Sequence, residues 1–289
     1  MRQRIITAIF FVAAMLGGVY YGRDTFFALF LIIAAGCLWE LLGLLLPEDE
    51  SHRGFRRIAG CLLGVLPVLI FGTNLIDTGF CGLSTLEEIS DMHGSSHFTA
   101  AAFSLASTLF LLAFLIIAEL FLAGKTPFTY IGHYLTGVFY ISLPTGLLFS
   151  VATPDALYSP NRVFGLLLLV WTNDSMAYFI GSQLGKHKLF ERISPKKTWE
   201  GTIGGGICTM LIAWGLSFYF KDFTTPQWVA LAAVAAVFGT LGDLVESMLK
   251  RSVGVKDSGN LLPGHGGLLD RFDAFIFALP FYWLVLQIV

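Results

Sequence analysis

Residues 228–252 read WVALAAVAAVFGTLGDLVESMLKRS. The stretch begins as an uninterrupted apolar run. As a whole, residues 228–252 are longer than the roughly 20 residues that a helix needs to cross a bilayer. Its second half carries acids and bases, although each charge at the bilayer centre costs about 2.5–3.5 kcal/mol or more. Such charges persist where they line a wet cavity or hold a ligand. The stretch therefore indicates a helical membrane protein with a polar site inside its spans.

The rest of the chain is equally apolar. Of its 289 residues, 55% are hydrophobic and 13% are charged, about half the charged fraction of a typical soluble domain. The four cysteines show no CxxC spacing, which argues against a zinc site or a disulfide framework. The ten-residue alternating segments of a membrane β-barrel are also missing. We predict an all-α, polytopic integral membrane protein.

The apolar runs predict about nine transmembrane helices, of which the third is short for a full span. They lie at 5–21, 26–46, 58–72, 98–123, 127–152, 163–184, 202–220, 228–249 and 268–288. With the N-terminus in the cytoplasm, 15 of the 18 Lys and Arg residues fall on the cytoplasmic side, as the positive-inside rule predicts. The acidic loop 73–97 then lies outside. The first run could also be a signal peptide, but no large soluble domain follows that would need export.

Residues 1–160 are expected to form scaffold helices that could supply contacts for a homodimer. Residues 161–289 are expected to form the catalytic region, with cytoplasmic loops at 185–201 and 250–267. Glu40 and Glu119 are isolated acids in the first part, and structural pairing and a functional role are equally open for them. The basic residues of that part that precede the third span, Arg53, Arg56 and Arg57, fit a topological role and contact with anionic lipid headgroups.

Polar side chains inside the spans concentrate in three late helices. At about 100° per residue, one stripe forms in 228–249, a second polar face forms in 163–184, and a pair of acids spaced i, i+3 begins 268–288. The stripe is Asp243, Glu246, Ser247 and Lys250; the second face is Asn173, Asp174, Ser175 and Tyr178; the pair is Asp270 and Asp273. A small-residue run, GTIGGG at 201–206, predicts close helix packing.

These residue types suit phosphate chemistry. Carboxylates gathered from separate helices need a cation between them, and hard oxygen ligands suit Mg²⁺, which often bridges to substrate phosphates. Basic residues in the adjoining loops, together with the glycine-rich LLPGHGG turn before the last helix, are typical phosphate partners. The pattern predicts phosphoryl or nucleotidyl transfer between a water-soluble and a lipid substrate, with charge neutralisation supplying much of the catalysis.

The longest motif, at 247–273, resembles the signature of the phosphatidate cytidylyltransferases, also called CDP-diacylglycerol synthases. Eleven fixed positions of that signature are present here: Ser247, Lys250, Arg251, Lys256, Asp257, His265, Gly266, Gly267, Asp270, Arg271 and Asp273. NDSMAYFIG at 173–181, SPKKTWEG at 194–201 and GDLVES at 242–247 resemble further elements of the family, in the same order. The first 160 residues resemble it only in being hydrophobic helices.

The resemblance implies the reaction of CTP with phosphatidic acid to give CDP-diacylglycerol and pyrophosphate. It implies catalytic roles for Asp243, Asp270, Lys250, Arg251, Asp273 and His265. It implies that Mg²⁺, with or without a second cation, is held by Asp243, Asp270, Asp174 and Glu246. It implies substrate binding by Lys196, Lys197, Thr198, Glu200, Ser247, Lys250, Arg251, Lys256, Asp257, Gly266, Gly267 and Arg271.

The skew of Lys and Arg predicts a site that faces the cytoplasm. We expect the membrane to be a bacterial cytoplasmic membrane, and we expect no nucleic-acid partner. Two other functions compete with this one. A CTP-dependent lipid kinase of the polyprenol type would release CDP in place of pyrophosphate. A transporter would also carry acids in its spans, although the one-sided basic rim and the glycine turn argue against it.

Overall fold

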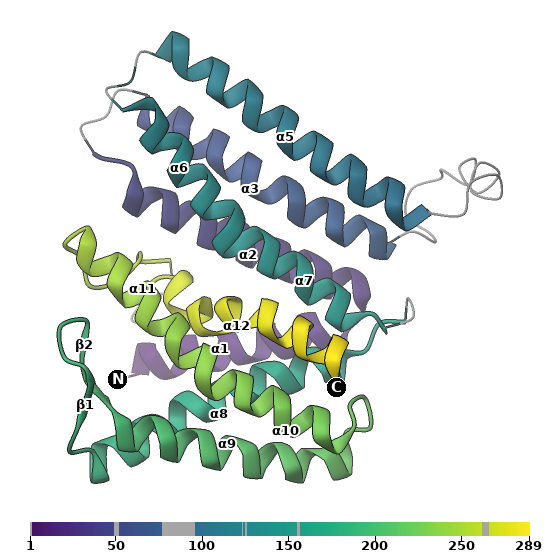
Figure 1. Cartoon of the computed structure of the whole chain (residues 1–289), viewed down its shortest axis with the longest axis vertical. Helices are drawn as coiled ribbons and strands as arrows, with labels where there is room; N and C mark the ends of the chain where they lie inside the picture. The colour runs from purple at the N-terminus through teal and green to yellow at the C-terminus, as the bar shows by residue number, and fades with distance from the viewer. Residues whose placement is uncertain are drawn as a thin grey trace. The chain divides into compact units, whose positions relative to one another are not determined.

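The computed structural model describes residues 2–48, 52–76, 96–122, 124, 126–154, 157–261 and 266–289, and these are helical apart from one short hairpin (Figure 1). The chain folds into two compact units. Unit 1 comprises Met1–Gly22 and Leu157–Val289, and unit 2 comprises Arg23–Ala156. The first helix therefore belongs with the C-terminal half, while the scaffold and catalytic roles assigned to 1–160 and 161–289 stay predictions.

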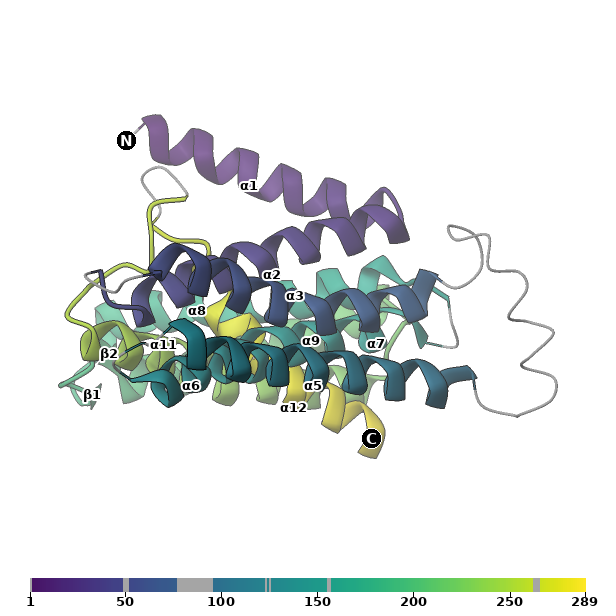
Figure 2. The ribbon, with the colours of Figure 1, turned by 90° about the horizontal axis from the view of Figure 1, so that it is seen from above.

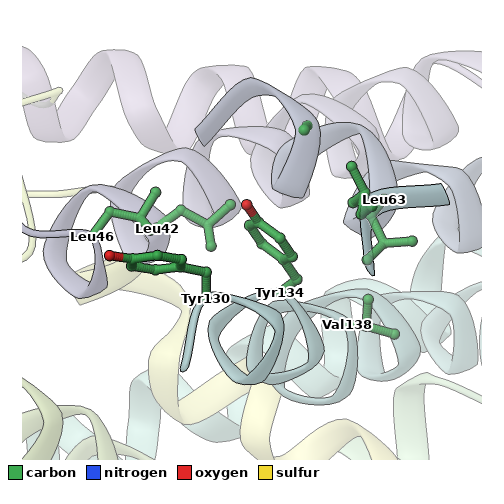
Figure 3. Packing of buried hydrophobic residues seen from close by; sticks show 8 residues of the cluster. Leu42, Leu46, Leu63, Tyr130, Tyr134 and Val138 are labelled. Atoms are coloured by element: carbon green, nitrogen blue, oxygen red, sulfur yellow. The ribbon is translucent and has the colours of Figure 1, made fainter. Parts of the chain in front are cut away.

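Unit 2 is built from helices alone. Its elements are α2 (Arg23–Leu45), α3 (Arg53–Ile76), α5 (Ser96–Leu122), α6 (Pro127–Gly137), a π-helical turn η1 (Val138–Ser142) and α7 (Leu143–Ala152). Helices α3 and α5 lie side by side in both views (Figures 1 and 2). A buried cluster from α2, α3 and α6, with Leu42, Leu63 and Tyr134 among its members, forms the apolar contact between these helices (Figure 3).

A buried ion pair crosses unit 2 beside that cluster. The guanidinium of Arg56 donates to both carboxylate oxygens of Glu119, at 2.9 and 2.7 Å, and both residues are almost completely buried. The Tyr134 hydroxyl donates to the same carboxylate, and the Tyr130 ring lies 4.3 Å below the guanidinium carbon. The lipid-headgroup role predicted for Arg56 is therefore wrong. Glu119 has a structural partner, since a charge in this interior is tolerated only when it is paired.

Unit 1 contains the remaining helices and the hairpin. Its elements are α1 (Arg2–Tyr20), α8 (Pro160–Leu184), β1 (Lys188–Phe190), β2 (Ser194–Thr198), α9 (Trp199–Tyr219), α10 (Thr225–Val234), the π-helical turn η3 (Ala235–Gly239), α11 (Thr240–Ser252) and α12 (Leu269–Ile288). Within this unit, α8 and α11 end, and α9 and α12 begin, on the side where the hairpin lies (Figure 1). The loop predicted at 185–201 thus contains an antiparallel strand pair that the sequence did not predict.

Close packing of α8 on α9 depends on glycine. A Cβ at Gly201 would lie 2.6 Å from the carbonyl oxygen of Ala177, and one at Gly205 would lie 2.9 Å from the same residue. Any larger side chain would push the helices apart, so the small-residue run at 201–206 has the packing role predicted for it. Because α9 begins directly after β2, this contact also fixes where the hairpin leaves the helices.

In the described part of the chain, seven helical segments are long and apolar enough to cross a membrane, which confirms the polytopic helical class. The first predicted span appears as a shorter apolar segment, Thr7–Tyr20. The third lies within α3, which starts with basic residues and contains Pro67, and it does not qualify as a span. Residues 77–95 of the predicted outer loop lie outside the described residues.

Candidate active site

The polar stripe of α11 follows directly from the π-helical turn η3. A π turn inserts one residue into the helical repeat and so rotates everything after it, and such turns are frequent at functional sites. Here α10, η3 and α11 form one continuous helical span, Thr225–Ser252. The rotation falls just before Thr240, so it sets which face of α11 turns toward α8 and α12.

Lys250 joins two acids from different helices. Its ammonium nitrogen lies 2.6 Å from Oε2 of Glu246, one turn earlier on α11, and 2.6 Å from Oδ1 of Asp270 at the start of α12. Lys250 and Glu246 are buried, so these charge-assisted bonds replace water around the ammonium group. The arrangement brings the predicted stripe and the predicted acid pair together through one lysine.

Asp270 also organises the glycine turn. Its Oδ2 accepts hydrogen bonds from the backbone N–H groups of Ser258, at 3.0 Å, and Gly267, at 2.8 Å. Gly266 has a φ of +82°, and a Cβ on it would lie 2.8 Å from the same carboxylate oxygen. Glycine is required there by both the backbone conformation and the space. Gly266 and Gly267 therefore lie against Asp270, and this contact accounts for the glycine at 266 in structural terms.

Lys197 connects the hairpin to α11. Its ammonium nitrogen lies 2.6 Å from Oδ2 of Asp243 and donates to the carbonyl oxygen of Thr240 at 3.4 Å. The Ser247 hydroxyl donates to the other oxygen of Asp243 at 3.2 Å. Both Lys197 and Asp243 are partly accessible. Strand β2 thus places a cation over the Asp243 end of the stripe, where both side chains are partly accessible to an entering anion.

Two further acids lie close to this ion pair, and a third lies next to one of them. Asp174 of α8 and Asp273 of α12 both interact electrostatically with Asp243, and Asp273 also lies next to Glu246. Among the buried atoms of the described residues, Oε1 of Glu246 has no hydrogen-bond partner. Carboxylates from three helices therefore converge on a region that two lysines neutralise only in part.

The described residues contain no group of three or more His, Cys, Asp or Glu side chains that could hold a metal by themselves. Lysine ammonium groups occupy the closest positions instead, on Asp243 and between Glu246 and Asp270. The metal roles of Asp243, Asp270, Asp174 and Glu246 therefore stay predictions.

Two residues predicted to bind substrate have structural partners. Thr198 caps α9, since its hydroxyl accepts from the N–H of Gly201 at 3.2 Å. Glu200 accepts hydrogen bonds from the backbone N–H groups of Lys186 and His187 and contacts Nδ1 of His187 at 2.6 Å. Glu200 thereby fastens the start of the hairpin to the first turn of α9. The roles of Thr198 and Glu200 toward substrate stay predictions.

The other residues predicted to bind substrate are mostly exposed. Exposed side chains are Lys196, Arg251, Lys256, Asp257 and Arg271. Arg251 donates to the carbonyl oxygen of Val255, so it stays over the loop after α11. His265 lies outside the described residues.

Two polar residues of the region were missed from the sequence. Thr240 accepts a hydrogen bond from the side-chain amide of Asn173 at 3.3 Å and so joins α11 to α8. Its position three residues before Asp243 was an available signal. Tyr282, fully buried in α12, interacts electrostatically with Asp174. Nothing local marks Tyr282, because the contact exists only once α8 and α12 have packed.

Comparison with known proteins gives matches along the whole chain. Residues 2–289 match the cytidylyltransferase family. The chain is 33% identical to the phosphatidate cytidylyltransferase of Bacillus subtilis over 100% of this chain and 98% of that protein. It is 41% identical to that of Staphylococcus haemolyticus over 97% and 96% of the two chains. A stronger local match, 53% identical to the Staphylococcus aureus protein, spans 115 residues, 39% of this chain and 44% of that one.

Proposed function

The chain belongs to the cytidylyltransferase family, and from that premise we propose that it is a phosphatidate cytidylyltransferase. The phosphate of phosphatidic acid attacks the α-phosphorus of CTP, the bond from that phosphorus to the β-phosphate oxygen breaks, and CDP-diacylglycerol and pyrophosphate result. The lipid phosphate is already an anion at neutral pH, so the step needs no strong general base. The product is a precursor for phospholipid synthesis.

The contact of Lys250 with both Glu246 and Asp270 is the observation that carries this proposal. It places an ammonium group among carboxylates at the end of one span and the start of the next. The acids hold the ammonium group of this lysine at the membrane boundary. It can therefore bind a phosphate there without being exposed to hydrocarbon. Reactions of phosphates depend mainly on such positioning and charge neutralisation.

The remaining cations lie beside the two ends of the polar stripe of α11. Lys197, over Asp243, and the neighbouring Lys196 suit the CTP phosphates, because the hairpin that carries them is partly exposed. Arg251, Lys256 and Arg271 lie exposed beyond the other end of the stripe and suit either phosphate.

The acids of the site fit a hard divalent cation. Their donor atoms are all oxygens, the ligand type that Mg²⁺ prefers, and Oε1 of Glu246 is buried without a donor. Asp243 and Asp270 are the proposed ligands, with Asp174 and Glu246 in support. Mg²⁺ keeps several waters and binds substrate phosphates, so it needs few protein ligands. Bound there, the ion would supply charge neutralisation on the phosphate oxygens.

The bacterial relatives and the apolar spans support a place in the bacterial cytoplasmic membrane. The skew of Lys and Arg supports a site that opens to the cytoplasm, where CTP is found. Contact between two copies through residues 1–160 remains a prediction.

The test uses purified full-length protein, CTP labelled on the α-phosphate, phosphatidic acid and Mg²⁺. We expect label in the lipid fraction and one pyrophosphate for each labelled lipid. Label that stays in water while CDP accumulates would identify a lipid kinase instead. Absence of both products, with solute flux in liposomes, would identify a transporter.

A further inference from the structure

The hairpin between α8 and α9 carries more positive charge than the site uses. Five basic residues and one acid lie between the two helices, and these basic residues are Lys186, Lys188, Arg192, Lys196 and Lys197. Lys197 pairs with Asp243, and Lys196 is its neighbour in β2. The structure gives the side chains of Lys186, Lys188 and Arg192 no hydrogen bond or ion pair within the described residues, and all three are exposed. Their charge therefore has no partner there.

Apolar side chains are exposed beside these charges. Phe190, at the end of β1, is 50% exposed, and Trp199, the first residue of α9, is 52% exposed. Leu184, the last residue of α8, is exposed too. Exposed aromatic rings next to lysines and arginines are typical of the membrane–water boundary, where rings enter the headgroup layer and cationic heads stay in water.

The hairpin also lies where such a boundary must be. One candidate span ends at Leu184 and the next begins at Trp199. Strand β1 starts only four residues after Leu184, where α8 ends. Even a fully extended chain therefore keeps the start of β1 within roughly 13 Å of the end of that span. The attraction of a basic segment to anionic lipid acts over about one Debye length, roughly 8 Å at physiological salt. The headgroup layer extends about 5–8 Å beyond the hydrocarbon core on each side, so the start of β1 lies within about one Debye length of the headgroups.

The hairpin is held firmly rather than trailing from the spans. Glu200 accepts from the N–H groups of Lys186 and His187, and the N–H of Trp199 donates to the carbonyl oxygen of His187 at 3.0 Å. At the turn, the N–H of Ile193 donates to the carbonyl oxygen of Phe190 at 3.2 Å. The exposed charges and rings therefore sit on a structured element that continues directly into Lys197.

We propose that segment 186–193 is an interfacial anchor that binds the anionic phospholipid headgroups surrounding the enzyme. Lys186, Lys188 and Arg192 contact the lipid phosphates, and Phe190 enters the boundary between headgroups and acyl chains. The occupant is the anionic lipid of the bilayer itself, which matches the hairpin in charge and in apolar character. This binding is separate from the transfer reaction and does not depend on it.

The test compares backbone hydrogen exchange in full-length protein embedded in two kinds of nanodisc, neutral phosphatidylcholine and phosphatidylcholine with one third phosphatidylglycerol. Each basic residue near an anionic surface changes affinity about fivefold, so we expect amides of 186–193 to exchange at least about fivefold more slowly in the anionic discs. High salt should remove the difference, because it shortens the Debye length. Exchange in α12 should be equal in both discs.

Matched variants separate charge from fold. Replacing Lys186, Lys188 and Arg192 by Gln should abolish the difference between the discs, while the opposite change in charge on the same turn, Glu191→Gln, should keep or enlarge it. Phe190→Ser should raise exchange in both discs. Equal exchange of wild type in the two discs would overturn the proposal. So would protection that appears with CTP in neutral discs and not with anionic lipid, since the charges would then serve the nucleotide.

Discussion

Two clusters of charge lie inside this membrane protein, and they are built differently. In unit 2, Arg56 and Glu119 form a closed pair: one cation, one anion, two direct bonds, and a tyrosine hydroxyl on the same carboxylate. In unit 1, two lysines face a larger number of acids, one carboxylate oxygen is left without a donor, and Asp243 remains partly accessible. A structural pair cancels its own charge, whereas a site keeps charge unbalanced for a ligand.

Asp270→Asn should have the largest effect. The change removes the charge that holds Lys250 and one proposed metal ligand, while an amide oxygen can still accept from Ser258 and Gly267. We expect kcat to fall by at least about a thousandfold, as when several kcal/mol of charge stabilisation are lost. The labelled-CTP assay measures it, with the melting temperature in detergent as the control for folding. A rate near that of wild type at ordinary Mg²⁺ would remove Asp270 from the machinery.

Arg56→Met should affect stability and leave the chemistry intact. Removing one partner of a buried pair leaves Glu119 charged and unpaired, at a cost of about 3–5 kcal/mol. Thermal unfolding in detergent should show a large drop, and the double variant Arg56→Met with Glu119→Leu should recover most of it. A loss of turnover in the double variant without a loss of stability would mean that this pair has a functional role as well.

Glu200→Ala tests the fastening of the hairpin. The variant loses the acceptor for the N–H groups of Lys186 and His187, so Lys197 is held less firmly over Asp243. Misplacing one binding group typically costs a factor of about 10 to 100, and we expect KM for CTP to rise by about tenfold with little change in kcat at saturation. Glu200→Gln, which retains an acceptor oxygen, should lie nearer to wild type. An equal fall of kcat in both variants would indicate direct contact with the reacting groups.

Ser247→Ala should give the smallest effect. It removes the hydrogen bond that this hydroxyl donates to the Asp243 carboxylate and leaves Lys197 in place. Because Asp243 is partly accessible, water can replace the lost donor, so the net loss is about 1 kcal/mol. We expect kcat/KM to fall about fivefold, measured by initial rates at low CTP. A loss as large as that of Asp270→Asn would show that the hydroxyl touches substrate.

Much of the site was predictable because helical periodicity is local. The spacing of Asp243, Glu246 and Lys250 fixes them to one face of any helix that contains them, and the motif at 247–273 was legible without a structure. The partner of Glu119 was not predictable, since Arg56 lies on a helix far away in sequence and its position suggested a span end. The hairpin was missed for a different reason, because strands of three and five residues are too short for a periodic signal.

The sequence by itself determined the class of the protein: apolar runs of membrane length, polar residues concentrated in late spans, and a motif typical of phosphate chemistry beside them. Only the tertiary structure decided the pairings, which place Lys250 between Glu246 and Asp270, Lys197 on Asp243, and Arg56 on Glu119. The reason is physical. A helix specifies which of its side chains share a face, but which face meets which depends on packing among helices, set here by glycines, π-helical turns and buried charge.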